Sequence, residues 1–241
     1  MSDVHVVTGG AGGMGGAIAE ILGQDDTVLL ADVDEAALEA TATDLQDAGA
    51  TDVHWQVTDI TDREAVDALA DEAAALGSLA SLVHTAGLSP TMADAERIAD
   101  VNLVGTGHLL DAFIDLAEEG TVAVCFASMA GYNIPRNGGY TSVLRDPLAD
   151  GVVENVARTV GGNSGGAYAL SKLGVQLLVE DQAEAWADQG ARIVSLSPGI
   201  IDTPMGHQEA EQQPQMATML ERTPLGRQGK PEEIASAVAF L

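Results

Sequence analysis

Tyr168 and Lys172 are the two residues whose types and spacing most clearly suggest chemistry. The chain has 241 residues but only three tyrosines and two lysines, and Lys172 follows Tyr168 by four positions. On a helix this spacing places both side chains on one face. A phenol titrates near pH ~10. At ~4 Å and an effective dielectric constant of ~20 a cation attracts the phenolate by roughly 4 kcal/mol, which would lower the phenol pKa by about two or three units. The pair is either an acid–base centre or an ordinary solvated helix face.

A glycine-rich loop follows directly after the first apolar segment, Val4 to Val7. It runs from Gly9 to Gly16 and leads into a helical pattern that starts at Ala17. In a parallel sheet, such a turn places backbone amides at a helix N-terminus, where glycines let the backbone approach a pyrophosphate closely. A tight turn without a ligand is the alternative. The strand–loop–helix context favours a dinucleotide site.

Asp32 ends the second apolar segment, 17 residues after Gly15. A carboxylate there can accept hydrogen bonds from both ribose hydroxyls of adenosine and would repel a 2′-phosphate. No arginine or lysine occurs in the glycine loop or just after Asp32. The sequence therefore predicts NAD rather than NADP as the cofactor. An exposed, N-capping aspartate is the alternative role of Asp32.

Apolar segments and helical patterns alternate along the whole chain. This alternation predicts parallel βαβ units and a doubly wound α/β sheet, a Rossmann fold with helices on both faces. No linker is visible, so residues 1–241 are expected to form a single domain. We expect strands at 4–7, 27–31, about 53–57, 79–83, around Cys125 and at 192–196, and helices from about 17, at about 35–48, 62–76 and 94–117, through Tyr168 and at 232–240.

The formal net charge of −27 is the most unusual bulk property. Repulsion by phosphates argues against nucleic acid and anionic membranes as partners. The acids are dispersed and indicate a solvated acidic surface, which either adaptation to high salt or a bias towards Ala, Gly and Asp explains. No segment resembles a signal peptide or a membrane span, so a soluble cytoplasmic protein is expected. The single cysteine, Cys125, is expected to be a buried strand thiol.

Several motifs give the chain a resemblance to the short-chain dehydrogenase/reductase family over essentially its whole length. They occur in the family's order, which is more specific than any one motif. They are TGxxxGxG at Thr8–Gly15, the adenine-contacting acid at Asp59, the end of NNAG at Ala86-Gly87, the helix asparagine at Asn102, the carbonyl-orienting serine at Ser128, YxxxK at Tyr168–Lys172, and PGxxxT at Pro198-Gly199 with Thr203. His84 and Thr85 replace both asparagines of NNAG, which affects the expected polar stabilisation of the central strand but not the fold.

The resemblance implies a role for each of these residues. Tyr168 would exchange a proton with the substrate, and Ser128 would hydrogen-bond the same substrate oxygen. Lys172 would hold the nicotinamide ribose and lower the pKa of Tyr168. Asn102 would hold a water of a proton relay, with a buried asparagine that satisfies helix backbone as the alternative. No metal site is predicted. The cofactor would contact Gly9, Gly13, Met14, Gly15, Asp32, Val33, Asp59, Ile60, Ala86, Gly87, Tyr168, Lys172, Pro198, Gly199, Ile201 and Thr203.

The segment between Ser128 and Tyr168 is longer than is usual in the family. The extra residues, about 131–166, contain two prolines and many glycines and predict a long irregular insertion. The insertion, together with Ala86-Gly87-Leu88, Asp111-Ala112-Phe113 and Gly161-Gly162-Asn163, resembles the 3-alpha-hydroxysteroid dehydrogenase/carbonyl reductase branch. It would lie where many members form tetramers. A homo-oligomer is expected, either a homotetramer or a homodimer that uses another face.

Residues 204–223 are expected to form a lid over the substrate. Met205, Met216, Met219 and Leu220 suit an irregular apolar surface, and so suggest a hydroxysteroid or another apolar cyclic alcohol or ketone. An ordinary apolar helix face is the alternative. After the last predicted helix the family adds a final strand and a glycine-containing tail, and this sequence stops at Leu241 before them.

Three functions are consistent with these patterns. The leading one is an NAD-dependent oxidoreductase that transfers a hydride between the cofactor and a secondary alcohol or ketone. The second is reduction of 3-oxoacyl thioesters, which the net acidity and the few nearby cations, Arg222, Arg227 and Lys230, disfavour. The third is a non-catalytic NAD-sensing module, against which the complete serine–tyrosine–lysine set argues.

Overall fold

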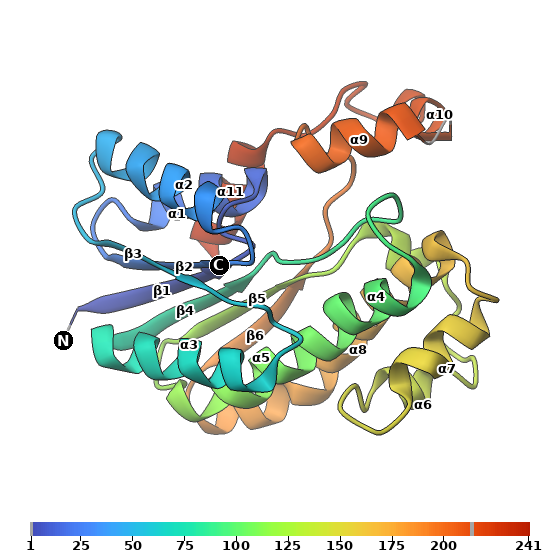
Figure 1. The fold of residues 1–241 in the computed structure, drawn as a ribbon, viewed down its shortest axis with the longest axis horizontal. Coiled ribbons are helices and arrows are strands. Elements are labelled where there is room, and N and C mark those ends of the chain that lie inside the picture. The colour runs from blue at the N-terminus through green and yellow to red at the C-terminus, as the bar shows by residue number, and fades with distance from the viewer. Residues whose placement is uncertain (1, 213–214) are drawn as a thin grey trace.

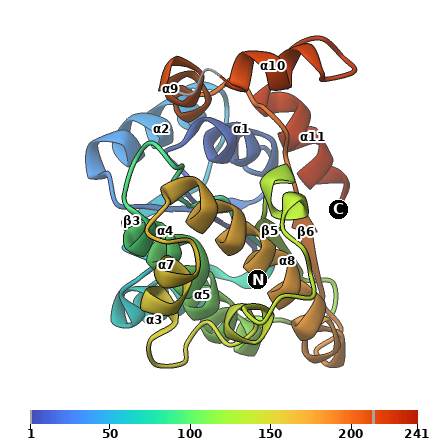
Figure 2. The same ribbon diagram turned by 90° about the vertical axis from the view of Figure 1, so that its right-hand side faces the viewer.

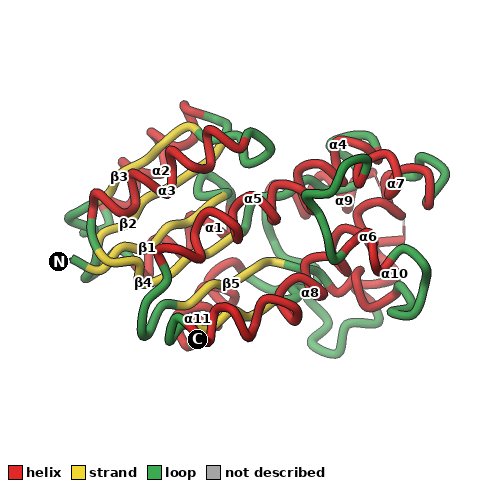
Figure 3. Tube along the Cα trace, turned by 90° about the horizontal axis from the view of Figure 1, so that it is seen from below, coloured by secondary structure: helices red, strands yellow, loops and turns green. Residues whose placement is uncertain are grey.

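The sheet is built from six parallel strands in the computed structural model, which describes residues 2–212 and 215–241. The strands are β1 (Asp3–Thr8), β2 (Thr27–Asp32), β3 (Val53–Val57), β4 (Ser78–His84), β5 (Val122–Phe126) and β6 (Arg192–Leu196). Their order across the sheet is β3-β2-β1-β4-β5-β6, and every neighbouring pair is parallel. Figure 3 shows β3, β2, β1 and β4 side by side. The predicted single-domain Rossmann-like α/β fold is confirmed.

Helices cover both faces of this sheet (Figure 1). They are α1 (Gly13–Leu22), α2 (Glu35–Asp47), α3 (Arg63–Leu76), α4 (Ala95–Ala99), α5 (Gly105–Phe113), α6 (Thr141–Leu144), α7 (Val152–Thr159), α8 (Ser164–Asp188), α9 (Pro204–Gln212), α10 (Gln215–Glu221) and α11 (Pro231–Phe240). α1, α2 and α11 lie on one face, and α3, α5 and α8 lie on the other. In the described ranges, each helix is too short or too polar to cross a membrane.

Side chains alternate between the two faces of each strand, and both faces are buried. On β1, Val6 belongs to the core shared with α3, α5 and α8, whereas Val7 belongs to the core shared with α1, α2 and α11. Leu29 and Leu30 of β2 divide between the two cores in the same way. A parallel sheet that is covered on both faces needs apolar residues at every strand position, which explains the uninterrupted apolar runs in the sequence.

The order of the strands creates a crevice between β1 and β4. These strands are neighbours, yet the chain continues from β1 towards β2 and from β4 towards β5. The segments that follow the two strands therefore separate at their carboxyl ends, and ligands of doubly wound sheets bind at such a point. Thr8 and His84, the last residues of β1 and β4, are register partners there.

The insertion at 131–166 is more regular than the sequence predicts. A 3₁₀ turn (Met129–Asn133) opens it, and both α6 and α7 lie within it. α7 forms because Val152, Val156 and Ala157 make an apolar stripe, which is buried where α7 packs against α4. α6 packs against α8, so both short helices lie beside the α4–α8 pair (Figure 2). The expectation of a wholly irregular segment was wrong because the prolines precede these helices and do not interrupt them.

The helix predicted at 94–117 is present but changes its type along its length. α4 passes into a π-helical turn (Asp100–Val104), then into α5 and a 3₁₀ turn (Ile114–Leu116). In the π-helical turn the amide of Gly105 bonds to the carbonyl of Asp100. Single π-helical turns occur frequently at functional sites. This turn contains Asn102.

Candidate active site

Two adjoining cavities lie at the carboxyl ends of the strands. The glycine-loop cavity, about 550 Å³, is lined by the loop after β1 and by Asp32. The Tyr168 cavity, about 330 Å³, is lined by Tyr168 and by residues of α9 and α10. Every predicted site residue except Asn102 lines one of the two cavities. The cavities form one continuous groove, because both are lined by Met14, Thr85, Gly87, Leu88, Thr203 and Met205.

The glycine loop fits closely between β1, α1 and the loop after β4. Gly9 has a φ of +70°, and a Cβ there would lie 2.6 Å from the backbone nitrogen of Ala86. A Cβ on Gly15 would lie 2.1 Å from the carbonyl oxygen of Gly9. The loop can therefore keep this shape only with glycine at both positions. It leaves the N-terminus of the ten-residue helix α1 facing the glycine-loop cavity, which suits a pyrophosphate.

Asp32 lies on one side of the glycine-loop cavity, at the end of β2. Its Oδ1 accepts a hydrogen bond of 2.7 Å from the amide of Val33 and a longer one of 3.4 Å from Asp34. These backbone bonds fix the carboxylate. Within the described residues its Oδ2 has no protein partner and can accept a bond from a ligand hydroxyl.

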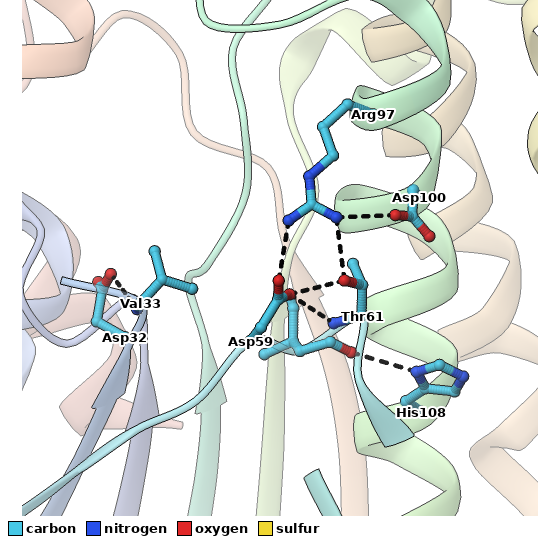
Figure 4. A network of polar contacts seen from close by, with 8 residues as sticks. Asp32, Val33, Asp59, Thr61, Arg97, Asp100 and His108 are labelled. Atoms are coloured by element: carbon cyan, nitrogen blue, oxygen red, sulfur yellow. Dashed lines mark hydrogen bonds and ion pairs between the residues drawn. The ribbon is translucent and has the colours of Figure 1, made fainter. Parts of the chain in front are cut away.

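Arg97 lies across the cavity from Asp32, and the sequence analysis missed it (Figure 4). Its guanidinium donates to Asp59 at 3.0 Å, to Asp100 at 2.9 Å and to Thr61 at 3.0 Å. Asp59 stands 38 positions before Arg97, so no local sequence pattern reveals the contact. Because two carboxylates already neutralise Arg97, the only cation in the lining of this cavity is committed to protein partners.

Ser128, Tyr168 and Lys172 meet in the Tyr168 cavity. Tyr168 and Lys172 lie in the first turns of α8, and Ser128 follows β5. The Tyr168 hydroxyl lies near that of Ser128, which opposes the rise in the pKa of the phenol. The Nζ of Lys172 lies 5.9 Å from the centre of the Tyr168 ring and donates to the carbonyl of Phe126 at 2.8 Å. A phenol and a hydroxyl therefore converge on one point in the cavity, with a buried ammonium behind them.

Burial governs the charge states of this pair. It raises the pKa of Tyr168 above its ordinary value; the Ser128 hydroxyl opposes this shift, and the negative charge of Glu209 adds to it. Burial also lowers the pKa of Lys172 to about 8. The expected lowering of the Tyr168 pKa by Lys172 was wrong in these surroundings. The ammonium is itself destabilised by burial, and it directs its hydrogen bond to a carbonyl.

Asn102 lies behind the groove and is fully buried in the π-helical turn. Its Oδ1 accepts a 2.7 Å bond from the amide of Leu88, and its Nδ2 donates a 2.9 Å bond to the carbonyl of the same residue. The side chain thus holds the loop after β4 in place. Gly87 packs between Asn102 and Lys172, since a Cβ on it would lie 3.0 Å from Oδ1 and 3.3 Å from Nζ.

Comparison with known proteins identifies the family. The family model described as short chain dehydrogenase matches residues 3–143, and one described as enoyl-(acyl carrier protein) reductase matches residues 152–241. The chain belongs to the short-chain dehydrogenase/reductase family. A short-chain dehydrogenase/reductase from Alternaria brassicicola, bsc3, is 34% identical over 100% of this chain and 89% of its own length.

Two further relatives carry more specific names. The cis-4-hydroxycyclohexanecarboxylate dehydrogenase of Sinomonas cyclohexanicum is 34% identical over 99% of this chain and 88% of its own length. The 3-alpha-hydroxysteroid dehydrogenase/carbonyl reductase of Comamonas testosteroni is 31% identical over 66% of this chain and 64% of its own length. As a short-chain dehydrogenase/reductase, the protein is an oxidoreductase that acts on an alcohol or ketone and uses a nicotinamide cofactor.

His84 takes the place of an asparagine in the short-chain dehydrogenase motif NNAG and keeps the central strands tied together. Its Nδ1 lies 2.8 Å from Thr8 Oγ1, and its Nε2 lies 2.9 Å from Thr106 Oγ1. Since the Thr106 hydroxyl donates to the carbonyl of Asn102, we assign the proton of His84 to Nε2. Thr85 donates to the carbonyl of Thr8 at 2.8 Å. His84 and Thr85, which stand in place of the two asparagines, thus supply the polar stabilisation that the loss of the asparagines had put in question.

The predicted lid region contains α9 and α10. Met205, Met216 and Met219 line the Tyr168 cavity as expected, whereas Leu220 does not. Residues 213 and 214 lie outside the described part of the chain. Glu209 of α9 also lines the cavity and was missed, because a glutamate in an acidic chain carries no sequence signal. Cys125 is fully buried as predicted, and burial raises its pKa to about 12.

Proposed function

We propose that the protein is an NAD-dependent dehydrogenase/reductase of secondary alcohols and ketones, with Ser128, Tyr168 and Lys172 as its catalytic residues. The convergence of these three side chains in a cavity continuous with the glycine-loop cavity carries the proposal. A non-catalytic NAD-sensing module would not need a phenol and a hydroxyl that converge on one point in the cavity. Only a failure to turn over any alcohol or ketone would favour the NAD-sensing module.

The mechanism follows from the positions of the side chains. Bound NAD supplies the hydride acceptor and a positive charge that favours the phenolate of Tyr168. In oxidation, the Tyr168 phenolate would accept the proton of the substrate hydroxyl, and the hydride on the carbon that bears this hydroxyl would go to NAD, so that a secondary alcohol becomes a ketone. The Ser128 hydroxyl hydrogen-bonds the reacting oxygen. Lys172 holds the nicotinamide ribose, and Asn102 positions the loop that carries Gly87.

The preference for NAD rests on the charges around the glycine-loop cavity. Asp32 would accept hydrogen bonds from the adenosine ribose and would repel a 2′-phosphate. Arg97 lines the glycine-loop cavity and could attract a phosphate, but Asp59 and Asp100 neutralise its charge. Asp59 would contact the adenine from the side opposite Asp32.

Replacing Asp32 by alanine should raise the relative affinity for NADP. Removal of one repulsive carboxylate and of its ribose bonds should shift the ratio of the NADP and NAD dissociation constants by about 10–100-fold, as expected for hydrogen bonds to a charged group. Fluorescence titration with both reduced cofactors measures this ratio. Asp34→Ala, which removes a neighbouring carboxylate that caps α2, is the matched control. An unchanged ratio in Asp32→Ala would remove the role given to that carboxylate.

The substrate proposed for the Tyr168 cavity is an apolar cyclic alcohol or ketone, such as a hydroxysteroid. The methionines of the lid and the resemblance to the 3-alpha-hydroxysteroid dehydrogenase/carbonyl reductase branch support it.

The insertion supports a homodimer over a homotetramer. Its helices α6 and α7 lie beside the α4–α8 pair, in the region where many family members would form tetramers. Reduction of 3-oxoacyl thioesters ranks second. Arg227, one of the few cations after the lid, pairs with Glu233 at 2.7 Å and so adds little to a phosphate-binding patch.

A panel of secondary alcohols tests the proposed function directly. Cyclic alcohols of increasing size, including a 3-hydroxysteroid, are incubated with NAD while the absorbance of the reduced nicotinamide is followed. We expect NAD reduction with cyclic alcohols and faster turnover with NAD than with NADP. Oxidation of NADPH by a 3-oxoacyl thioester alone would favour the second candidate, and absence of any turnover would overturn the proposal.

A further inference from the structure

We propose that Glu209 is a specificity-determining residue. It would make the Tyr168 cavity favour alcohols and ketones that carry a hydrogen-bond donor, a second hydroxyl or an ammonium group, away from the reacting carbon, and disfavour carboxylates. The inference rests on the proposed function, since it concerns substrates of the same cavity. It goes further by adding one polar requirement to an otherwise apolar substrate.

Glu209 reaches the cavity from α9, on the side of the lid. The same cavity is lined by Ser128, Tyr168, Met205 of α9, and Met216 and Met219 of α10. Ser89, a fully buried serine in the loop after β4, lies near the carboxylate, and its hydroxyl opposes the rise in the pKa of Glu209. The Ser89 hydroxyl also lies 3.0 Å from that of Thr91. Glu209 is therefore partly buried and faces the loop after β4 across the groove.

The charge of Glu209 acts inside the cavity. It contributes to raising the pKa of Tyr168, and burial raises the pKa of Glu209 itself. Both shifts agree with the geometry, in which the partly buried Glu209 and Tyr168 line the same cavity. A substrate held against Tyr168 would consequently lie next to this carboxylate.

No other side chain in the lining of this cavity can play the same role. Lys172 is the only other charged residue among those that line it, and its ammonium is committed to the carbonyl of Phe126. Among the described residues, no cation pairs with Glu209. A partly buried carboxylate with one neutral neighbour retains unused acceptor capacity, and a ligand donor that fills it would be bound more tightly.

Four ring-matched probes distinguish this selectivity from a general preference for apolar substrates. They are cyclohexanol, 1,4-cyclohexanediol, 4-aminocyclohexanol and 4-hydroxycyclohexanecarboxylate, which differ only in the group remote from the reacting hydroxyl. With the NAD-loaded enzyme, kcat/KM should be about 10–100-fold higher for the amine and the diol than for cyclohexanol, since a hydrogen bond to a charged group is worth that much. The carboxylate should be the poorest substrate.

Variants of Glu209 then assign the preference to this residue. Glu209→Gln should abolish most of the difference between the amine and the carboxylate, and Glu209→Leu should make cyclohexanol the best of the four. Glu211→Gln removes the same charge from an exposed position on α9 and should leave the wild-type order unchanged. The same order of substrates in wild type and Glu209→Gln would overturn the inference.

Calorimetric titration of the four probes into the NAD-loaded Tyr168→Phe variant, which should bind them with little turnover, is compared with NAD reduction by the wild type and separates this inference from the proposed function. Turnover of all four probes with no dependence on the remote group would overturn the role of Glu209 and leave the proposed function intact. Binding that follows the predicted order without any NAD reduction would support the role of Glu209 and contradict the proposed function. Equal dissociation constants for the amine and the carboxylate would overturn the inference regardless of turnover.

Discussion

Replacing Tyr168 by phenylalanine should lower kcat by about 10²–10⁴-fold, the usual contribution of a positioned acid–base group. The substitution removes one oxygen atom and leaves the ring that packs in the Tyr168 cavity. The proton of the substrate hydroxyl then has no acceptor, because Ser128 is a neutral hydroxyl and the Lys172 ammonium donates to the carbonyl of Phe126. Steady-state kinetics with the best alcohol of the panel measures the effect.

The cofactor affinity of the Tyr168→Phe variant is the decisive accompanying measurement. The glycine loop, Asp32 and Lys172 remain in place, so fluorescence titration with reduced NAD should give a dissociation constant close to that of the wild type. Tyr132→Phe is the matched control, because Tyr132 is 68% exposed and lies outside both cavities. Unaltered turnover in Tyr168→Phe would overturn the mechanism. Loss of cofactor binding would show that the phenol has a structural role instead.

The strands could be predicted from the sequence because their burial leaves a simple pattern. β2 lies in the middle of one half of the sheet and both of its faces are covered, so residues 28–31 form an unbroken apolar run. The glycine loop could be predicted equally well, because the close approach of Gly15 to the carbonyl of Gly9 excludes any side chain at that position. Local geometry imposed these residue types, and local patterns therefore reveal them.

The parts that could not be predicted depend on contacts between distant segments. Arg97 reaches Asp59 only because the segment after β3 runs up to α4, and Glu209 comes near Ser89 only because α9 faces the loop after β4. The direction of the Tyr168 pKa shift could not be predicted from the sequence either. The four-residue spacing places Lys172 beside the phenol, but the sequence does not tell that both groups are buried or that Phe126 takes the ammonium's hydrogen bond.

His84 illustrates how a departure from a family motif can preserve the function of the replaced residue. An asparagine at the end of β4 can bridge neighbouring strands with one amide. The imidazole of His84 reaches Thr8 on one side and Thr106 on the other, and so links the start of the glycine loop to the first turn of α5, directly after the π-helical turn. This link requires one neutral tautomer, because the Thr106 hydroxyl donates its hydrogen bond to the carbonyl of Asn102 and so can only accept one from His84.

The neutral state of His84 should make the stability of the protein depend on pH. Burial, together with the charge of Lys172, lowers the pKa of His84 from 6.5 to about 3. Below pH 6.5 the unfolded chain therefore binds a proton that the folded protein does not bind. The contribution of His84 to stability is complete above pH 6.5 and is lost as the pH falls towards 3. The free energy of unfolding should decrease by roughly 1.4 kcal/mol for each pH unit in this window.

Urea unfolding of the wild type and His84→Asn between pH 4 and 7 isolates this effect from the many carboxylates, which both proteins share. The wild type should lose stability relative to His84→Asn as the pH falls, with a difference in slope of about 1.4 kcal/mol per pH unit. Thr106→Val is the matched control. It leaves the imidazole buried with one unsatisfied N–H, so it should lower stability by about 1–3 kcal/mol while keeping the wild-type slope. Parallel slopes in the wild type and His84→Asn would contradict a neutral, buried His84. A flattened slope in Thr106→Val would assign the shift to the hydrogen bond rather than to burial.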